Sequence, residues 1–138
     1  MTAKEALLCP VLPYRPDPLR PHRRGQAGLV ELPIATTPGL RLPAFGWTLL
    51  LSEPLRRHVL AAMRARPFLN LELHGIDLLD ADEDGLPAAL RGKQPDLRVP
   101  LRDKRRALQA TLREVAAGCE VRPLQEVADE VHREGGLR

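Results

Sequence analysis

The amino-acid sequence predicts an α/β fold that forms part of an incomplete (β/α) barrel. The predicted elements alternate in the order strand, helix, strand, helix, strand, helix, which favours a sheet of mostly parallel strands. In addition, the strand predicted at residues 68–74 alternates leucines with polar residues. A barrel strand has this pattern, because one face meets the outer helices and the other faces the interior. Three or four strands cannot close a barrel, so we expect either a small open sheet or a portion of a larger domain.

The chain has 138 residues, which suits one domain or a piece of one. Residues 1–27 are predicted to be a short strand, at 6–9, followed by a lead-in loop rich in proline and arginine. Each proline there fixes φ and disfavours a helical conformation in the preceding residue. Residues 28–134 are predicted to be part of an α/β barrel domain, and residues 135–138 a tail.

The first half of the barrel portion contains two strands and one helix by apolar spacing. A strand is predicted at 28–34, where Pro33 places its end at an edge or a mouth. A helix is predicted to begin after Ser52, an N-cap residue, and to stop before Pro67. The alternating strand at 68–74 follows directly.

The second half contains two helices and one short strand. The spacing of apolar residues predicts a helix over 101–117, with Gly118 as its C-terminal stop. A short strand is predicted at 119–121. Pro123 then begins a last amphipathic helix, which ends near Gly135.

Composition excludes several functional classes. Aromatic residues make up 3% of the chain, too few for a platform on which single-stranded bases stack. The two cysteines, Cys9 and Cys119, cannot form a disulfide framework and lack the C-x-x-C spacing of zinc or redox sites. No apolar run approaches the ~20 residues that span a bilayer, and the first residues do not read as a secretory signal. We therefore expect a cytoplasmic protein with no membrane partner.

His74 is the leading candidate for chemistry. It ends the predicted strand beside Gly75, and active sites of parallel α/β folds gather at the carboxyl ends of strands. An imidazole there can act as a general acid or base near neutral pH, although a buried histidine bonded to a loop carbonyl is an equally good interpretation. Asp77 either orients the imidazole or caps a loop. Glu72, on the polar face of the same strand, is expected in a structural ion pair.

Two charged segments have structural interpretations. Asp80, Asp82 and Asp84 match the first half of a calcium loop, but the twelfth position is Arg91 where a bidentate glutamate belongs. A solvated acidic loop is therefore expected. The basic run at 91–106 is expected to be a solvated helix face, and a phosphate-binding surface is the alternative.

The order of these segments resembles the C-terminal half of the NodB-homology polysaccharide deacetylases. The resemblance covers about residues 7–131: GLVELPIA, a Pro/Gly loop, RPFLNLELHGIDL, a basic helix and CEVRPLQEVADEV. Its most specific part is the strand ending in Leu73-His74, which is similar to the family's late L-x-H motif. The resemblance implies an irregular (β/α) barrel and hydrolysis of the carbon–nitrogen amide bond of N-acetylated sugars. It makes His74 the catalytic acid toward the departing amine, and Leu73 a substrate-binding residue in the pocket for the acetyl group.

The same resemblance implies a divalent metal, often zinc, held by an aspartate and two histidines. The chain lacks both a T-F-D-D-like motif and an H-x-x-x-H-like pair. We therefore expect no metal ligand and no cofactor in this chain, and a fragment that is inactive alone. An intact form is expected to bind N-acetylated carbohydrate, and the fragment to self-associate through an exposed barrel edge. Nucleic acid is disfavoured as a partner, although a small basic module that binds nucleic acid or protein is the alternative.

Overall fold

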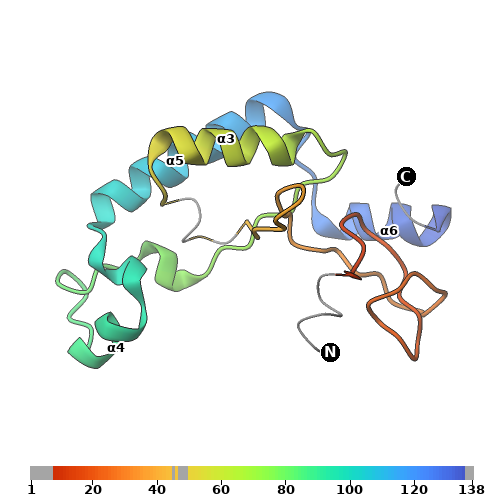
Figure 1. Ribbon diagram of the computed structural model, residues 1–138, viewed down its shortest axis with the longest axis horizontal. Helices are drawn as coiled ribbons and strands as arrows, with labels where there is room; N and C mark the ends of the chain where they lie inside the picture. Colours follow the sequence, from red (N-terminus) through yellow and green to blue (C-terminus); the bar gives the residue numbers. More distant parts are fainter. Residues whose placement is uncertain (1–7, 45, 47–49, 136–138) are drawn as a thin grey trace.

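The computed structural model describes residues 8–44, 46 and 50–135, and helices dominate this part of the chain (Figure 1). The elements are α3 (Glu53–Arg64), η1 (Gly75–Leu78), α4 (Ala88–Lys93), η2 (Pro95–Arg98), α5 (Leu101–Gly118) and α6 (Leu124–Glu134), where η denotes a 3-10 turn. Among the residues described, no helix combines the length and apolar character needed to cross a bilayer.

The helices α3, α5 and α6 lie where apolar spacing and stop signals predicted them. Ser52 occupies the N-cap position of α3, although its side chain makes no capping hydrogen bond, and a proline follows in the first turn. Gly118 is the last residue of α5. Gly135 ends α6 with a φ of 80°, a left-handed conformation that favours glycine. These local signals therefore sufficed to predict the three longest helices, whereas α4 and the turns η1 and η2 were not predicted.

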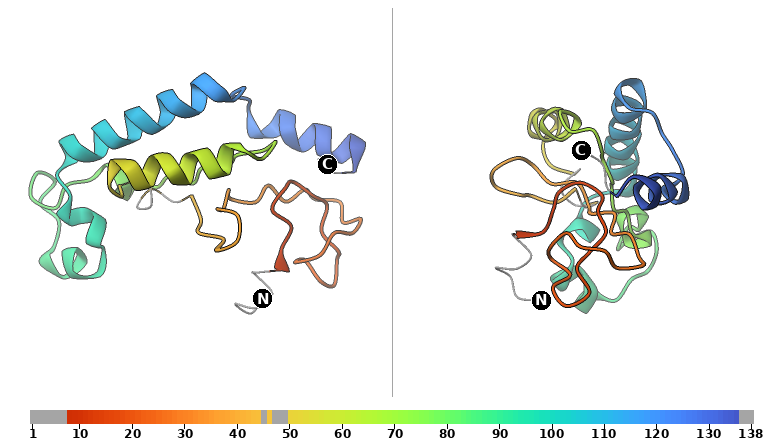
Figure 2. Two further views of the ribbon diagram at one scale, coloured as in Figure 1. Left: turned by 45° about the horizontal axis from the view of Figure 1, so that its top comes forward. Right: turned by 90° about the vertical axis from the view of Figure 1, so that its right-hand side faces the viewer.

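The core lies between α3 and α5, which run side by side (Figure 2). Leu60 of α3 and Val115 of α5 are buried in one apolar cluster. Val59 and Met63 of α3 belong to a second cluster, which also contains Ala35 and Ala44. Both clusters bury apolar side chains that α3 presents on its inner face.

The extended segment at 68–74 connects the two clusters. Leu69 and Leu71 pack against both of them, as the alternating pattern predicted, whereas the third leucine of this face, Leu73, is 42% exposed and belongs to neither cluster. The backbone of the segment is tied to neighbouring loops by single hydrogen bonds. Ala35 N donates to the carbonyl oxygen of Asn70 over 2.8 Å, and Glu72 N donates to that of Ala44 over 3.2 Å.

The predicted α/β barrel portion is wrong for the part of the chain that the structure describes. Its β pairing consists of isolated bridges, and no described residue lies in a strand of a sheet. Prolines explain this at 28–43, where Pro33, Pro38 and Pro43 lack the N–H group that a ladder requires. The exposed barrel edge that was expected to mediate self-association is absent from the same residues.

The two other short strands, predicted at 6–9 and 119–121, are also not formed by the residues that the structure describes. Residues 119–121 connect α5 to α6 without β pairing. Of the strand predicted at 6–9, residues 6 and 7 lie outside the described part, and the other two are not in a strand. Of the predicted tail, residues 136–138 also lie outside it.

The lead-in loop is held by hydrogen bonds from side chains to the backbone. The Tyr14 hydroxyl donates to the carbonyl oxygen of Pro21 over 2.7 Å. Arg15 donates through Nε to the carbonyl oxygen of Ala27 over 2.8 Å. Arg24 lies over the Tyr14 ring, with its guanidinium carbon 5.9 Å from the ring centre. This loop therefore has a defined structure despite its proline content.

Candidate functional site

His74 and Glu72 lie together at the end of the extended segment. The Nε2 atom of His74 is 3.6 Å from Oε1 of Glu72. Residues two apart on an extended chain share a face, so the sequence pattern correctly predicted that these two side chains lie on the same side of the segment. The His74 side chain is 59% exposed, which contradicts the interpretation of a buried histidine. Glu72 forms an ion pair with the imidazole whenever the ring is protonated.

Asp77 fixes the backbone around His74. The His74 amide donates to Oδ2 of Asp77 over 2.6 Å, and the Asp77 amide donates back to the carbonyl oxygen of His74 over 3.0 Å. Asp77 thus caps the turn η1, one of the two roles that the sequence left open. A Cβ atom on Gly46 would overlap the Asp77 carboxylate, so the close approach of these two segments requires glycine at position 46.

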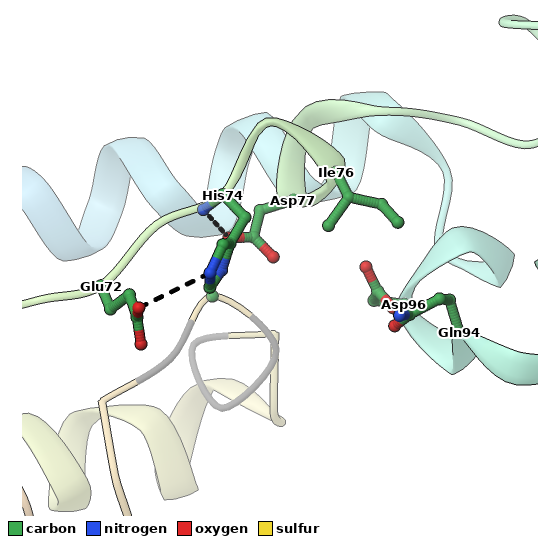
Figure 3. A pocket seen from close by; sticks show the side chains of 7 residues that line it. Glu72, His74, Ile76, Asp77, Gln94 and Asp96 are labelled. Carbon is green, nitrogen blue, oxygen red and sulfur yellow. Dashed lines mark hydrogen bonds and ion pairs between the residues drawn. The ribbon is translucent and has the colours of Figure 1, made fainter.

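These residues line an open cavity of about 420 Å³ (Figure 3). The other lining residues come from η1, η2 and the residue that precedes η2. Of the residues that the structure describes, the lining comprises Gly46, Glu72, His74, Ile76, Asp77, Gln94 and Asp96. The wall therefore combines carboxylates, an imidazole, an amide and one apolar side chain, a donor and acceptor set suited to a small polar ligand.

Sequence reasoning missed the far side of this cavity. Asp96 and Gln94 lie in a stretch that the sequence assigned to a solvated basic run, and no motif marks either residue. Asp96 lines the cavity from η2, and its side chain is 7% exposed. The only local signal is Pro95, which begins the short turn that carries Asp96.

Lys104 stands behind Asp96 and is fully buried, although the sequence placed it within a solvated basic run. Its Nζ atom donates to the carbonyl oxygen of Leu79 over 2.6 Å and lies 4.0 Å from Oδ2 of Asp96. A buried ammonium requires such partners, because removal from water penalises an unpaired charge. Lys104 therefore joins α5 to both turns, η1 through the residue that follows it and η2 through Asp96.

Leu73, the expected acetyl-pocket residue, is not among the residues that line this cavity. Its side chain alternates with those of Glu72 and His74 along the extended segment, and the residue is 42% exposed. The structure thus brings His74 together with Glu72, Asp77 and Asp96, but does not add Leu73 to the group.

The carboxylates of the acidic loop hold the chain together. Asp80 accepts hydrogen bonds from the backbone amides of Asp82, Glu83 and Leu101. These bonds, that of Leu101 first, hold the pKa of Asp80 below its usual range. Asp82 pairs with Arg91, the residue that occupies the position of the missing calcium ligand. A structural loop therefore accounts for these acids.

The arginines of α5 are exposed as the sequence predicted. Arg102 and Arg106 have side chains more than four-fifths exposed, and each lies within 4 Å of a carboxylate oxygen of Asp103. Arg105 is exposed beside them. This part of the helix forms a solvated basic face, partly offset by one acid.

The described residues contain no set of ligands for the metal that the resemblance implies. Within residues 8–44, 46 and 50–135, no group of three or more His, Cys, Asp or Glu side chains could hold a metal ion. The donors of the cavity therefore do not fit the aspartate and two histidines that the resemblance implies.

Comparison with known proteins leaves the family open. No protein-family model matches the chain, and no curated protein and no solved structure matches it either.

Proposed function

We propose that this chain carries the proton donor of a polysaccharide deacetylase-like hydrolase that cleaves the carbon–nitrogen amide bond of N-acetylated sugars. His74 is the donor, and Glu72 is its charge partner. The observation that carries the proposal is the placement of the His74 ring, which is solvent-accessible on the wall of the cavity with a carboxylate oxygen 3.6 Å from Nε2. An exposed, charge-paired imidazole in a cavity is suited to acid–base chemistry.

The chemistry needs a proton at one step. When the tetrahedral intermediate of amide hydrolysis collapses, the carbon–nitrogen bond breaks, and the departing amine must be protonated. A protonated His74 gives its proton to that nitrogen, and the Glu72 carboxylate stabilises the charged ring beforehand. The capped turn at Asp77 holds the His74 backbone in place during this transfer. The group that activates water is, in this proposal, not one of the residues described here.

The cavity has groups suited to the sugar itself. Its carboxylates accept hydrogen bonds from hydroxyl groups, and the Gln94 amide both donates and accepts. Ile76 offers apolar surface to the face of a sugar ring (Figure 3). A hydroxyl-rich ligand can therefore form hydrogen bonds with several groups of the wall at once.

Ligand titration of the isolated chain tests this proposal. We expect the trimer of N-acetylglucosamine to shift the His74 imidazole NMR signals with a dissociation constant of ~1 mM, about 4 kcal/mol. The His74→Gln variant should weaken this binding. The control His132→Gln, which replaces an exposed histidine on α6, should leave it unchanged. The chain alone should release no acetate. If the trimer causes no shift, or if the matching glucose trimer binds equally well, the proposal is wrong.

A kinetic test applies in any longer form that does release acetate. There, His74→Gln should lower kcat by roughly 10²–10⁴-fold, the usual contribution of a general acid. Metal affinity should not change, because His74 donates a proton and does not coordinate. Loss of metal in this variant would make His74 a ligand and would refute the assigned role.

The exposed arginines of α5 favour a second candidate function, a basic surface for nucleic acid or an acidic protein. Arg102, Arg105 and Arg106 are all exposed on one helix. Binding through them should weaken as salt rises, because counterions are released on association. Neutralising the three arginines together should abolish it. An absence of RNA affinity at low salt would eliminate the nucleic-acid version.

A further inference from the structure

Asp96 is a cavity residue whose carboxylate accepts no hydrogen bond from the part of the chain that the structure describes. Its side chain is 93% removed from solvent, and it lines the cavity across from His74 (Figure 3). Among the described residues, no donor forms a hydrogen bond with either of its carboxylate oxygens. The nearest cation, Lys104, stays 4.0 Å from Oδ2 and directs a 2.6 Å hydrogen bond to the carbonyl oxygen of Leu79 instead.

Such a carboxylate has only part of what stabilises charge in a protein interior. A buried anion is stabilised by a counter-ion and by hydrogen-bond donors, and Asp96 has the counter-ion, Lys104, without a donor from the described residues. Lys104 offsets the charge of Asp96 at a distance but does not supply a hydrogen bond. A donor that arrives from the cavity would supply one, and a charged donor forms stronger bonds to a carboxylate than a neutral donor does.

The other charges of the wall determine which donor fits best. Glu72 and Asp77 add two further carboxylates, engaged with the ring and the backbone amide of His74, respectively. Among the described residues, no lysine or arginine lines the cavity. The potential inside is therefore negative whenever His74 is neutral, and it favours a cation.

We propose that Asp96 is a specificity-determining residue that binds a free primary ammonium group of the ligand. This inference rests on the proposed function and refines its substrate class. The preferred ligand is a glycosamine oligomer that is already partly deacetylated, with an ammonium group at Asp96 and an acetamido group at His74. A fully acetylated oligomer lacks the cation and leaves Asp96 without a strong donor.

Calorimetric titration of the whole chain with defined trimers tests the inference. We expect the trimer with one acetyl group to bind about tenfold more tightly than the fully acetylated trimer at low salt, with the difference reduced at high salt. The variant Asp96→Asn should remove this tenfold preference and change the affinity for the fully acetylated trimer by less than about twofold. The control Asp129→Asn removes one exposed acid on α6 and should retain the preference.

The comparison of ligands on the unmodified chain does not depend on whether a variant folds. Equal binding of both trimers to the unmodified chain overturns the role of Asp96 and leaves the proposed function intact. Binding of neither trimer overturns both. Binding of glucosamine trimers alone, with no affinity for any acetamido group, supports the ammonium site and refutes the deacetylase substrate.

Discussion

The buried pair of Lys104 and Asp96 allows a quantitative test of the structure. The two side chains are 1% and 7% exposed, and their charged atoms are 4.0 Å apart. At this separation, the Coulomb energy is ~1 kcal/mol in bulk water and ~4 kcal/mol at an effective dielectric constant of 20. We therefore expect a coupling energy of ~1–4 kcal/mol between them.

A double-mutant cycle measures this coupling directly. Lys104→Met keeps the length of the side chain, Asp96→Asn keeps its shape, and urea unfolding followed by circular dichroism gives the free energy of each variant. Lys104→Met should also cost ~1–3 kcal/mol beyond the coupling, because the carbonyl of Leu79 loses its donor.

An exposed pair on the same helix provides the matched control. Arg106 and Asp103 approach more closely, at 3.7 Å, but their side chains are 82% and 41% exposed. Water and salt screen such a pair, so the cycle of Arg106→Met with Asp103→Asn should give at most ~0.5 kcal/mol. Equal coupling energies in the two cycles would refute the reasoning, because burial would then have no effect on the strength of the pair.

Three further predictions concern stability and titration. Leu60→Ala should lower the free energy of unfolding by ~2–5 kcal/mol and Leu112→Ala by much less, as measured by urea unfolding, because Leu60 is fully buried and Leu112 is 46% exposed. Tyr14, the only tyrosine, should ionise at about pH 12 in an absorbance titration of the folded chain, because burial raises its pKa. In the unfolded chain the tyrosine ionises at ~10. The neutral hydroxyl of folded Tyr14 therefore contributes fully to stability below pH ~10, and this contribution is lost as pH rises through the folded pKa. An ionisation midpoint at pH ~10 in the folded chain would contradict the burial of Tyr14. Hydrogen bonds from backbone amides, that of Leu101 first, lower the pKa of Asp80, so the Asp80 carboxylate stabilises the fold above the unfolded pKa of ~3.9 and this contribution is lost on acidification. Asp80→Asn should therefore flatten the pH dependence of the free energy of unfolding in the acid range. An unchanged acid-unfolding curve would count against these hydrogen bonds.

The helices α3, α5 and α6 could be predicted because their signals are local. The apolar periodicity of α3 and α5, a proline in the first turn of α3 and Gly135 after α6 are all visible within a few residues. The strands could not be predicted in the same way. Alternation correctly placed Leu69 and Leu71 against the helices, but a sheet also needs partner strands with free N–H groups, and the proline-rich segments do not provide them.

Half of the candidate site could be predicted, for the same reason. His74, Glu72 and Asp77 lie within six residues of one another, so their proximity follows from an extended segment and a turn. Asp96 and Gly46 reach the cavity only because separate segments fold toward η1, and no spacing in the sequence encodes that approach. Lys104 illustrates the same limit. It belongs to a basic run that the sequence predicts to be solvated, but Asp96 and the carbonyl group of Leu79, both from other segments, lie next to its ammonium group.

The segment that carries Leu69 and Leu71 continues directly into Glu72 and His74, so core and cavity share one stretch of backbone. Tolerance to mutation should therefore be unusually low here. A substitution that relaxes the contact between the helices would also shift the imidazole, and gains in stability or in ligand affinity would be hard to select independently.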